Sequence, residues 1–499
     1  MRIKGRFEIM PDWQKAILAG LLIAMSIVFP YVGLLVVPGV YLCIRTLFEA
    51  KTFWQTIKMG WLIWFVKGLL VVSFFWSVYP VESFPIQNIF NELGLIFVSW
   101  ALVAFAISIG GVVVSGLVHG IKIFRTPKIA VVLLVPLFWV LGELVGSLSY
   151  SAITLGSGSS VQAFFSVGYV GYALISIPGY LGWAVVAGVY GLTLILICLV
   201  TGWYFANNQY NKKIIIGAVL LLAFVGFGIT ALAPEETNTP TVLSIDTFFP
   251  ANSMVEENAQ AKRRVVLDEA VNEARKYRPD YILLPEDSRY LDSVFSSDDR
   301  RHAYNLFQFL NSTSSVTIVD SALTKVSDAG NEAVLRSFVF SAVNTPMMSD
   351  KRYITPLGEY LPYVTKQLIN LTGNSEVLNH PALGSYIEGR LKPVANYVGP
   401  VVLFCYESVS PTAVRTLLSQ QNSKPLFVAH LVSQAWFHSS FLLTHQLDSM
   451  LRVQAVWNRV TIISAGNRAV GKTYRLDGSF VVNEEIASGE GWVIRRSKF

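Results

Sequence analysis

The chain has 499 residues, of which 53% are hydrophobic and only 14% charged, and its mean hydropathy is +0.49. Soluble globular proteins carry about 25% charged residues, so this composition excludes a wholly soluble protein and predicts that much of the chain lies in lipid. The formal net charge of +6 does not indicate nucleic-acid binding, because many basic residues lie in short loops between apolar runs. We therefore expect no nucleic-acid partner.

Apolar runs fill the first half of the chain and predict a membrane domain over residues 1–234. Seven runs have roughly the length needed to cross about 30 Å of hydrocarbon. They cover residues 12–29, 31–46, 58–79, 94–118, 128–148, 179–203 and 213–232. The basic start of the chain, Met1–Arg6, followed by an apolar run, is also typical of a signal peptide. Because no clear cleavage site follows, we interpret the first run as a retained helix.

The charges of the connecting loops predict the orientation of these spans. Basic residues gather before the first span, between the second and third, between the fourth and fifth, and before the seventh, whereas the intervening loops carry acidic residues such as Glu82, Glu92, Glu235 and Glu236. Basic loops stay in the cytoplasm. An odd number of spans then places everything after Pro234 outside the cytoplasm. We expect a multi-pass protein of the inner or plasma membrane with an extracytoplasmic soluble domain.

Residues 240–486 predict a soluble layered α/β domain, because short β-rich runs alternate with helical stretches. The helical stretches are Glu256–Tyr277, one beginning at Asp298, and His445–Asn458. The expected strands are Thr241–Ile245, Tyr281–Leu284, Val316–Val319, Phe338–Val343, Val401–Cys405, Leu426–Val432 and Thr461–Ser464. Residues 487–499 are interpreted as a polar C-terminal tail, and no terminal membrane helix is expected.

Three cysteines are present, and they do not predict a disulfide framework. Cys43 and Cys198 lie inside apolar runs, so Cys405 is the only cysteine of the polar half. A lone thiol in a soluble domain is most often an inert core residue. Only the surrounding sequence can favour a catalytic role for Cys405.

Three segments at expected strand ends provide that context. Glu286 follows the run Leu283–Pro285, Lys351 opens the segment up to Pro362, and Cys405 ends the apolar strand that begins at Val401. A thiol needs a base to ionise it, a carboxylate can serve as that base, and an ammonium group stabilises a tetrahedral oxyanion. Taken alone, each residue has an ordinary interpretation as a loop carboxylate, a surface lysine or a core cysteine. No histidine flanks Cys405, although a distant one remains an alternative base.

The order and flanks of these residues resemble the nitrilase superfamily, and in particular its apolipoprotein N-acyltransferase branch. The resemblance rests on Lys351-x-x-x-x-Pro-x-Gly-Glu-Tyr-x-Pro362 and on Cys405-Tyr-Glu407. It extends to Ala435–Phe437, His445-Gln446, Arg452, Asn467, Glu143, and the runs 171–174 and 188–192, and so covers most of the chain, spans included.

The resemblance implies a nitrilase-type αββα sandwich joined to a multi-span α-helical membrane domain. It implies that Glu286 is the general base, Lys351 the catalytic lysine and Cys405 the acylated nucleophile, with Glu359, Glu407 and Tyr406 in support. The family moves an acyl chain from a phospholipid, through a thioester, to the α-amino group of an S-diacylglyceryl cysteine on an apolipoprotein. The expected partners are therefore a phospholipid donor, that lipoprotein acceptor and the membrane.

Several departures from the family pattern bear on the acceptor. Ser433-Gln434 replaces Asn-Asp before Ala435-Trp436-Phe437, and His438 follows where the family has glycine. Ser244–Asp246 replaces a Gln-x-Asn pattern, and the family's final membrane helix is missing. An amidase or acyltransferase with a different acceptor is thus the alternative. A transporter or scaffold with an inactive domain is a third interpretation, which the intact Glu286, Lys351 and Cys405 oppose.

Four residues are candidates for binding lipid. Trp436, Phe437 and Tyr360 lie beside catalytic positions, and Glu143 lies inside an expected span, where an ionisable group is costly. For Trp436 and Phe437 the alternative is an ordinary core position, and for Glu143 it is a structural hydrogen bond. Lys67 also lies in an apolar run. No phosphate-binding glycine loop or paired-cysteine motif occurs, so we expect no cofactor and no metal. We expect a monomer.

Overall fold

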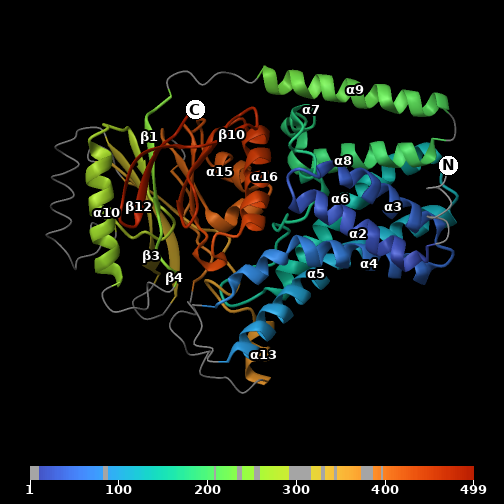
Figure 1. Cartoon of the computed structure of the whole chain (residues 1–499), viewed down its shortest axis with the longest axis horizontal. Helices are drawn as coiled ribbons and strands as arrows, with labels where there is room; N and C mark the ends of the chain where they lie inside the picture. Colours follow the sequence, from blue (N-terminus) through green and yellow to red (C-terminus); the bar gives the residue numbers. More distant parts are fainter. Residues whose placement is uncertain are drawn as a thin grey trace.

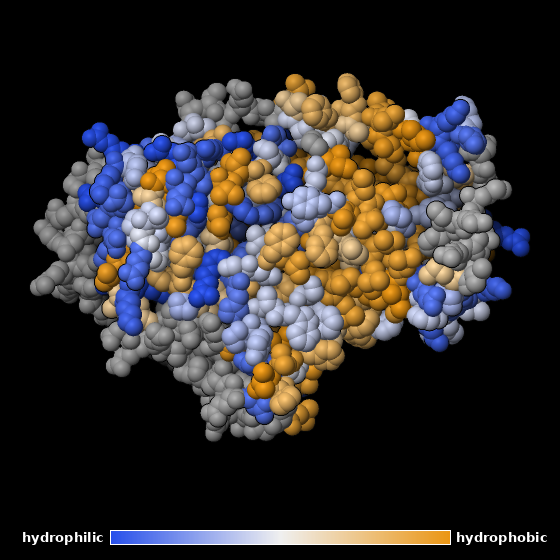
Figure 2. All heavy atoms as spheres, in the orientation of Figure 1, coloured by the Kyte–Doolittle hydropathy of each residue, from blue (hydrophilic) through white to orange (hydrophobic). Residues whose placement is uncertain are grey.

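The computed structural model describes residues 10–81, 88–206, 209–232, 239–251, 259–291, 316–326, 332–341, 346–371, 386–394 and 397–499. Long helices form one half of the molecule and an α/β unit forms the other (Figure 1). The space-filling view has the same division, because apolar side chains cover the helical half and polar ones are concentrated over the α/β half (Figure 2).

Among its described residues, the helical half contains five helices that are long and apolar enough to cross a membrane. They are α4 (Phe53–Val71, continued by the 3-10 turn η2, Ser73–Val78), α5 (Ile89–Ile123), α6 (Lys128–Ile153), α8 (Ala184–Phe205) and α9 (Gln209–Ala231). These correspond to the last five expected spans. The first two expected spans contain α2 (Asp12–Val28) and α3 (Val36–Glu49), which have 17 and 14 residues. That α2 and α3 cross the membrane stays a prediction.

The sixth expected span, residues 179–203, is not one continuous helix. A four-residue helix, α7 (Pro178–Leu181), precedes α8, and the backbone leaves helical geometry at Ala187 and Gly188. Gly188 has a φ of +57°, and a Cβ there would lie 2.3 Å from the ring of Trp457. A residue with a side chain is therefore excluded, because the backbone conformation and the indole of the α/β half both require glycine.

The α/β half contains twelve described strands in one branched sheet. They are β1 (Val242–Thr247), β2 (Tyr281–Leu283), β3 (Thr317–Lys325), β4 (Ala333–Phe340), β5 (Met347–Asp350), β6 (Val401–Phe404), β7 (Val428–Ser433), β8 (Ile462–Asn467), β9 (Lys472–Tyr474), β10 (Phe480–Val482), β11 (Glu484–Gly489) and β12 (Trp492–Arg496). Strands β1, β2 and β3 are parallel, as are β6, β7 and β8. The two sets join where Thr247 of β1 pairs with Asn467 of β8.

Alternation along the strands sorts their side chains into three apolar layers. Val402 and Phe404 of β6 share a core with residues of β1–β5, whereas Val401 and Leu403 face α15 (Ala413–Leu418) and α16 (Phe441–Asn458). Leu243 of β1 faces the other way, toward α10 (Ala259–Arg275). Because successive side chains of a strand point to opposite faces, this pattern places two sheet layers between two helix layers. The αββα arrangement that the resemblance implied is therefore confirmed.

Residues 487–499 are not a tail. Strand β12 pairs antiparallel with β1, from Leu243 opposite Arg496 to Thr247 opposite Trp492. Trp492 and Ile494 are 3% and 0% exposed and pack in the layer under α10. The charged residues of this segment suggested a solvated end, but the buried Trp492 and Ile494 alternate with the less buried Val493 and Arg495, which is the pattern of a strand with one buried face.

All seven expected strands are present, as β1–β4 and β6–β8. The strands β5 and β9–β12 were not predicted, because they are short or polar. Of the expected helices, α10 and α16 are present, and the one beginning at Asp298 lies outside the described residues. A short helix, α13 (Tyr363–Leu371), follows the segment Lys351–Pro362, which we call the lysine segment.

Helix α16 joins the two halves. Its apolar side chains Leu443, Leu447, Met450, Val453 and Val456 belong to the same buried cluster as residues of the long helices. Gln446 donates a hydrogen bond to the Val71 carbonyl at 3.0 Å, and Arg452 donates to the Ile175 carbonyl at 3.2 Å. The α/β half is therefore packed on the helical half through a common core.

Candidate active site

The three residues of the predicted triad lie just beyond the carboxyl ends of β2, β5 and β6. Strand β5 is antiparallel to β4, which is antiparallel to β3, so β5 runs in the same direction as β2 and β3. Strand β6 runs in that direction too, because β6–β8 are parallel and β8 is parallel to β1. The sheet thus delivers Glu286, Lys351 and Cys405 to one edge, where rigid strands fix the positions of the following residues.

Lys351 lies between two carboxylates. Its Nζ is 3.0 Å from Oε1 of Glu286 and 2.6 Å from Oε1 of Glu359, and its side chain is 1% exposed. The second oxygen of Glu359 accepts a hydrogen bond from the Thr355 backbone N–H at 2.7 Å. A buried ammonium is tolerated when it is paired in this way. Burial alone lowers the pKa of Lys351, but Glu286 and Glu359 more than offset this and raise the pKa above its ordinary value.

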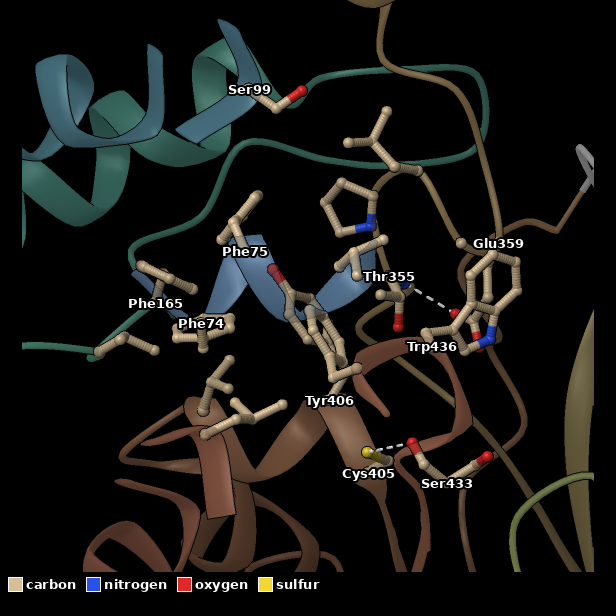
Figure 3. A pocket seen from close by; sticks show the side chains of 18 of the residues that line it. Phe74, Phe75, Ser99, Phe165, Thr355, Glu359, Cys405, Tyr406, Ser433 and Trp436 are labelled. Atoms are coloured by element: carbon tan, nitrogen blue, oxygen red, sulfur yellow. Dashed lines mark hydrogen bonds between the residues drawn. The ribbon is translucent and has the colours of Figure 1, made fainter. Parts of the chain in front are cut away.

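Cys405 is the first residue of the 3-10 turn η4 (Cys405–Val409). Its Sγ donates a hydrogen bond to the Ser433 carbonyl at 3.5 Å (Figure 3). Burial and the Glu286 carboxylate raise the pKa of Cys405 to about 12, although Lys351 lowers it. Near neutral pH the thiol therefore keeps its proton and needs a base.

Glu286 has the protonation behaviour that such a base requires. Burial raises the pKa of Glu286 to about 7, against the lowering effect of the Lys351 ammonium. A general base acts best when its pKa is near the working pH, because it is then both available and strong enough. The arrangement can thus take a proton from Cys405 and hold a cation close to the sulfur.

Glu407, expected in a supporting role, joins two catalytic segments. Its Oε1 accepts from the Arg352 backbone N–H at 2.7 Å, and its Oε2 accepts from the Phe404 N–H at 3.0 Å. Arg352 follows Lys351 and Phe404 precedes Cys405. The buried carboxylate of Glu407 therefore fixes the distance between the two segments.

An apolar cavity opens beside Cys405, between the two halves of the protein (Figure 3). Its volume is about 1270 Å³, including solvent at the mouth. The helical half contributes Phe74, Phe75, Val78, Val81, Leu95, Ile96, Ser99, Tyr150, Phe165 and Val167. The α/β half contributes further lining residues, which include Cys405, Glu286, Glu359 and Tyr406, and Leu443 and Leu447 of α16. The helical half and the α/β half therefore line this cavity together, with Cys405 among the lining residues.

Two of the four predicted lipid-binding residues line this cavity. Trp436 and Phe437, in the 3-10 turn η5 (Ala435–Phe437), are half-buried, and the ring of Phe437 packs edge-on to Phe74 with centroids 5.6 Å apart. Tyr406 also lines the cavity and shares a hydrogen bond of 2.6 Å with the hydroxyl of Tyr150.

The other two, Tyr360 and Glu143, do not line this cavity, and their role in binding lipid stays a prediction. The Tyr360 hydroxyl donates to the Thr154 carbonyl at 2.7 Å, which ties the lysine segment to the end of α6. Glu143 is 1% exposed among the helices and accepts hydrogen bonds from the Val170 N–H at 2.8 Å and the Thr193 hydroxyl at 3.2 Å. Both residues have structural hydrogen bonds away from the cavity.

The structure adds site residues that local sequence did not indicate. The Ser433 carbonyl accepts from the thiol, and because this is a backbone contact it does not depend on the departure at that position. The side chain of Ser433 accepts from Asn467 Nδ2 at 3.3 Å, and Gln434 Oε1 accepts from Thr444 at 2.9 Å. Phe74 and Phe75 lie far from the triad in sequence, and no local pattern distinguishes them from other aromatic residues of a membrane helix.

Replacing Glu407 tests whether it joins the two segments. We expect Glu407→Ala to lower the free energy of unfolding by roughly 1–3 kcal/mol for each of the two buried N–H groups that lose an acceptor. Glu407→Gln keeps one acceptor oxygen and should give a smaller loss. Thermal unfolding in detergent measures both, with the exposed Glu490→Ala as the control. An unchanged melting temperature in Glu407→Ala would contradict the assignment.

Comparison with known proteins agrees with the resemblance in the sequence. No family model matches the chain. An apolipoprotein N-acyltransferase of Allorhizobium ampelinum is 22% identical over 67% of this chain and 64% of its own length. One from Rhizobium leguminosarum bv. trifolii is 20% identical over 87% of this chain and 78% of its own length. The chain thus spans slightly less than two thirds of the first relative.

Solved structures that align with about half of this chain include an amidase of the nitrilase superfamily and a synthetase. An amidase of that superfamily from Nesterenkonia AN1 is 12% identical, covers 53% of this chain and 92% of its own, and has a TM-score of 0.34. The glutamine-dependent NAD+ synthetase of Acinetobacter baumannii is 16% identical over 49% of this chain and 43% of its own, also with a TM-score of 0.34. The resemblance inferred from the sequence is confirmed: this chain is a multi-helix relative of proteins named apolipoprotein N-acyltransferases.

Proposed function

We propose that the protein moves a fatty acyl chain from a phospholipid, through a thioester on Cys405, to the N-terminal amine of an S-diacylglyceryl-cysteine apolipoprotein. The observation that carries this proposal is the position of the Cys405 thiol at an apolar cavity walled by membrane helices. A small water-soluble amide would not require such a wall, whereas an acyl chain entering from the bilayer would. The names of the relatives point to the same chemistry.

In the first half-reaction, the Glu286 carboxylate accepts the thiol proton of Cys405. The thiolate attacks the ester carbonyl carbon, a C–S bond forms, and the Lys351 ammonium stabilises the oxyanion. When the tetrahedral intermediate collapses, the C–O bond breaks and the proton on Glu286 passes to the departing lysophospholipid oxygen. The products are the Cys405 thioester and a lysophospholipid.

In the second half-reaction, the lysophospholipid leaves and the acceptor amine attacks the thioester carbonyl. Glu286 accepts a proton from the amine as the C–N bond forms. The C–S bond then breaks, and the sulfur is released as a thiol after the proton returns to it. Because the same site serves both acyl carriers in turn, the kinetics should be ping-pong.

The membrane arrangement belongs to this proposal. Residues 1–234 form a membrane domain of seven spans in the inner or plasma membrane. The domain from residue 240 onward lies on the side away from the cytoplasm, and the protein acts as a monomer. This orientation follows from the basic loops and the odd number of spans.

Protease protection tests the orientation. In intact spheroplasts, we expect an added protease to cleave the α/β domain while a cytoplasmic marker protein survives. Permeabilised spheroplasts provide the control for cleavability. Cleavage of the domain only after permeabilisation would contradict the orientation.

Intact-mass analysis tests the thioester. After incubation with phospholipid, we expect the mass of one acyl chain on the wild-type protein, which hydroxylamine removes. Cys405→Ser should carry no adduct, because a lone carboxylate is a weak base for a hydroxyl group. Cys43→Ser is the matched control and should acylate normally. An adduct on Cys405→Ser would make Cys405 a structural residue.

The acceptor is tested by adding peptides to the isolated acyl-enzyme. A diacylglyceryl-cysteinyl peptide should remove the acyl chain and gain it as an amide. Transfer instead to water or to the unlipidated peptide would favour the alternative of an amidase or an acyltransferase with another acceptor.

The pH dependence follows from the raised pKa of Glu286. The base must be deprotonated to act, so below about pH 7 the single-turnover acylation rate should fall by about tenfold per pH unit. Above this pH the rate should level off. Glu286→Gln should lose most of the rate and lack this ascending limb. A wild-type rate that is constant between pH 5 and 8, roughly the range over which such a group titrates, would exclude Glu286 as the base.

Trp436→Ala separates a lipid-binding role from a core role. A half-buried indole at the cavity should affect lipid turnover more than stability. A fully buried indole would cost about 3–5 kcal/mol when removed. We therefore expect a slower acylation rate with a nearly unchanged melting temperature, and Trp492→Ala, in the core, should do the reverse. A large loss of stability in Trp436→Ala would make it a core residue.

A further inference from the structure

A second cleft lies on the α/β half, beside the end of β5 and the start of the lysine segment. We call it the cationic cleft. It is lined by residues 349, 350, 352 and 353, by residues 389–393, and by residues 407, 413, 416, 417 and 420. None of these residues lines the apolar cavity beside Cys405, although some are neighbours in sequence of residues that do. The two hollows are therefore distinct.

Three basic side chains line the cationic cleft: Arg352, Arg390 and Lys392. In the part of the chain that the structure describes, none of them pairs with a carboxylate. All three are exposed, although Arg352 also lies over the ring of Tyr353 with its Cζ 5.6 Å from the centroid. Three cations in one hollow create a positive potential, which the shape of the hollow concentrates.

The two carboxylates that line the cleft are already engaged. Asp350 pairs with Arg336 at 2.6 Å and accepts from the Leu391 N–H at 3.1 Å. Glu407 is 5% exposed and its two oxygens accept from backbone N–H groups. They therefore offset the three cations only in part, and the cleft keeps a positive excess.

Backbone contacts hold together the two chain segments that carry these cations. The Gly389 N–H donates to the Lys351 carbonyl at 2.8 Å, and the Asp350 N–H donates to the Leu391 carbonyl at 3.0 Å. A Cβ at Gly389 would lie 2.0 Å from the Cβ of Asp350, so only glycine permits this approach. The segment carrying Arg390 and Lys392 is thus pinned to the segment carrying Arg352, which makes the cleft a built site rather than a chance grouping of surface residues.

The cleft also adjoins the helical half. The ring of Tyr353 stacks on Phe164, with centroids 4.7 Å apart, and Phe164 lies in the connection that follows α6. The neighbouring Glu388 accepts from the backbone N–H and the hydroxyl of Ser160 in the same connection, at 2.8 and 2.9 Å. A group at the membrane surface could therefore reach the cleft.

We propose that the cationic cleft binds a phosphate group through Arg352, Arg390 and Lys392. Guanidinium groups match phosphate oxygens with paired N–H donors, and a lysine adds a point charge. Thr416 and Gln420 also line the cleft and offer neutral hydrogen-bonding groups. The phosphate comes either from an anionic phospholipid headgroup or from free phosphate in solution. This site goes beyond the proposed acyl transfer and does not depend on it.

Calorimetric titration of the full chain in a phosphate-free, uncharged detergent tests the proposal. The probes are inorganic phosphate and dihexanoylphosphatidylglycerol. We expect saturable binding of at least one of them, weakened about tenfold or more in Arg390→Gln/Lys392→Gln. The matched control, Lys262→Gln/Arg278→Gln, removes one lysine and one arginine on and beyond α10 and should bind as the wild type does.

The outcomes separate the two sources. If the variants weaken binding of only the lipid, the ligand is a phospholipid headgroup. If they weaken binding of only inorganic phosphate, the ligand is free phosphate. If they weaken binding of both probes, the site accepts either ligand. Arg352→Gln should weaken binding of the same probe. This single variant covers the case in which the double variant fails to fold. The proposal is overturned if the wild type binds neither probe, or if the folded variants bind as tightly as the control. Because the readout is binding, failure of the acyl-transfer proposal would leave this result unaffected.

Discussion

The buried ammonium of Lys351 is the constraint around which the site is arranged. A charge that is 1% exposed must be compensated, and here Glu286 and Glu359 both contact it. Glu359 lies on the loop in which its carboxylate accepts a hydrogen bond from the Thr355 N–H, and Glu286 lies beyond the end of β2. The same ammonium therefore holds this loop and the end of this strand together. It also contacts the carboxylate of Glu286, which lines the same cavity as Cys405. Charge compensation and catalytic geometry are thus met by the same contacts.

The second requirement is that the two halves of the protein share the cavity. Helix α16 packs its apolar face into the core of the membrane helices, and the connection after α6 is joined to the lysine segment. The Tyr363 N–H donates to the Leu155 carbonyl at 2.8 Å, and the Glu388 N–H donates to the Gly158 carbonyl at 2.8 Å. These bonds place the membrane-side wall of Phe74, Phe75 and Phe165 next to the sulfur. A nitrilase-type sheet alone would present the thiol to water.

The local parts of this account could be predicted from the sequence, whereas the parts set by distant contacts could not. Glu286 and Cys405 each follow a predicted apolar strand, and such strand ends are recognisable in a single sequence. Lys351 follows β5, which was not predicted, and it was singled out by the pattern of the segment that it begins. Trp436 and Phe437 were singled out because they lie close to the motifs in sequence, and both line the cavity, although their binding of lipid stays a prediction. Tyr360 was singled out in the same way, but it does not line the cavity, and its hydroxyl donates to the Thr154 carbonyl instead. Phe74, Phe75 and the contact between Gly188 and Trp457 depend on how two halves pack, which no local pattern records. The cationic cleft likewise depends on the close approach of Gly389 to Asp350.

A double-mutant cycle of the acylation rate tests most directly whether Lys351 and Glu286 act as one unit. The single-turnover rate would be measured for the wild type, Lys351→Met, Glu286→Gln and the double variant. If the ammonium works by orienting and balancing Glu286, the effects are not additive, and the double variant should be about as slow as the slower single one, with a coupling of roughly 0.5–3 kcal/mol. If the two losses simply multiply, the residues act independently and the central role assigned to the Lys351 ion pairs is contradicted.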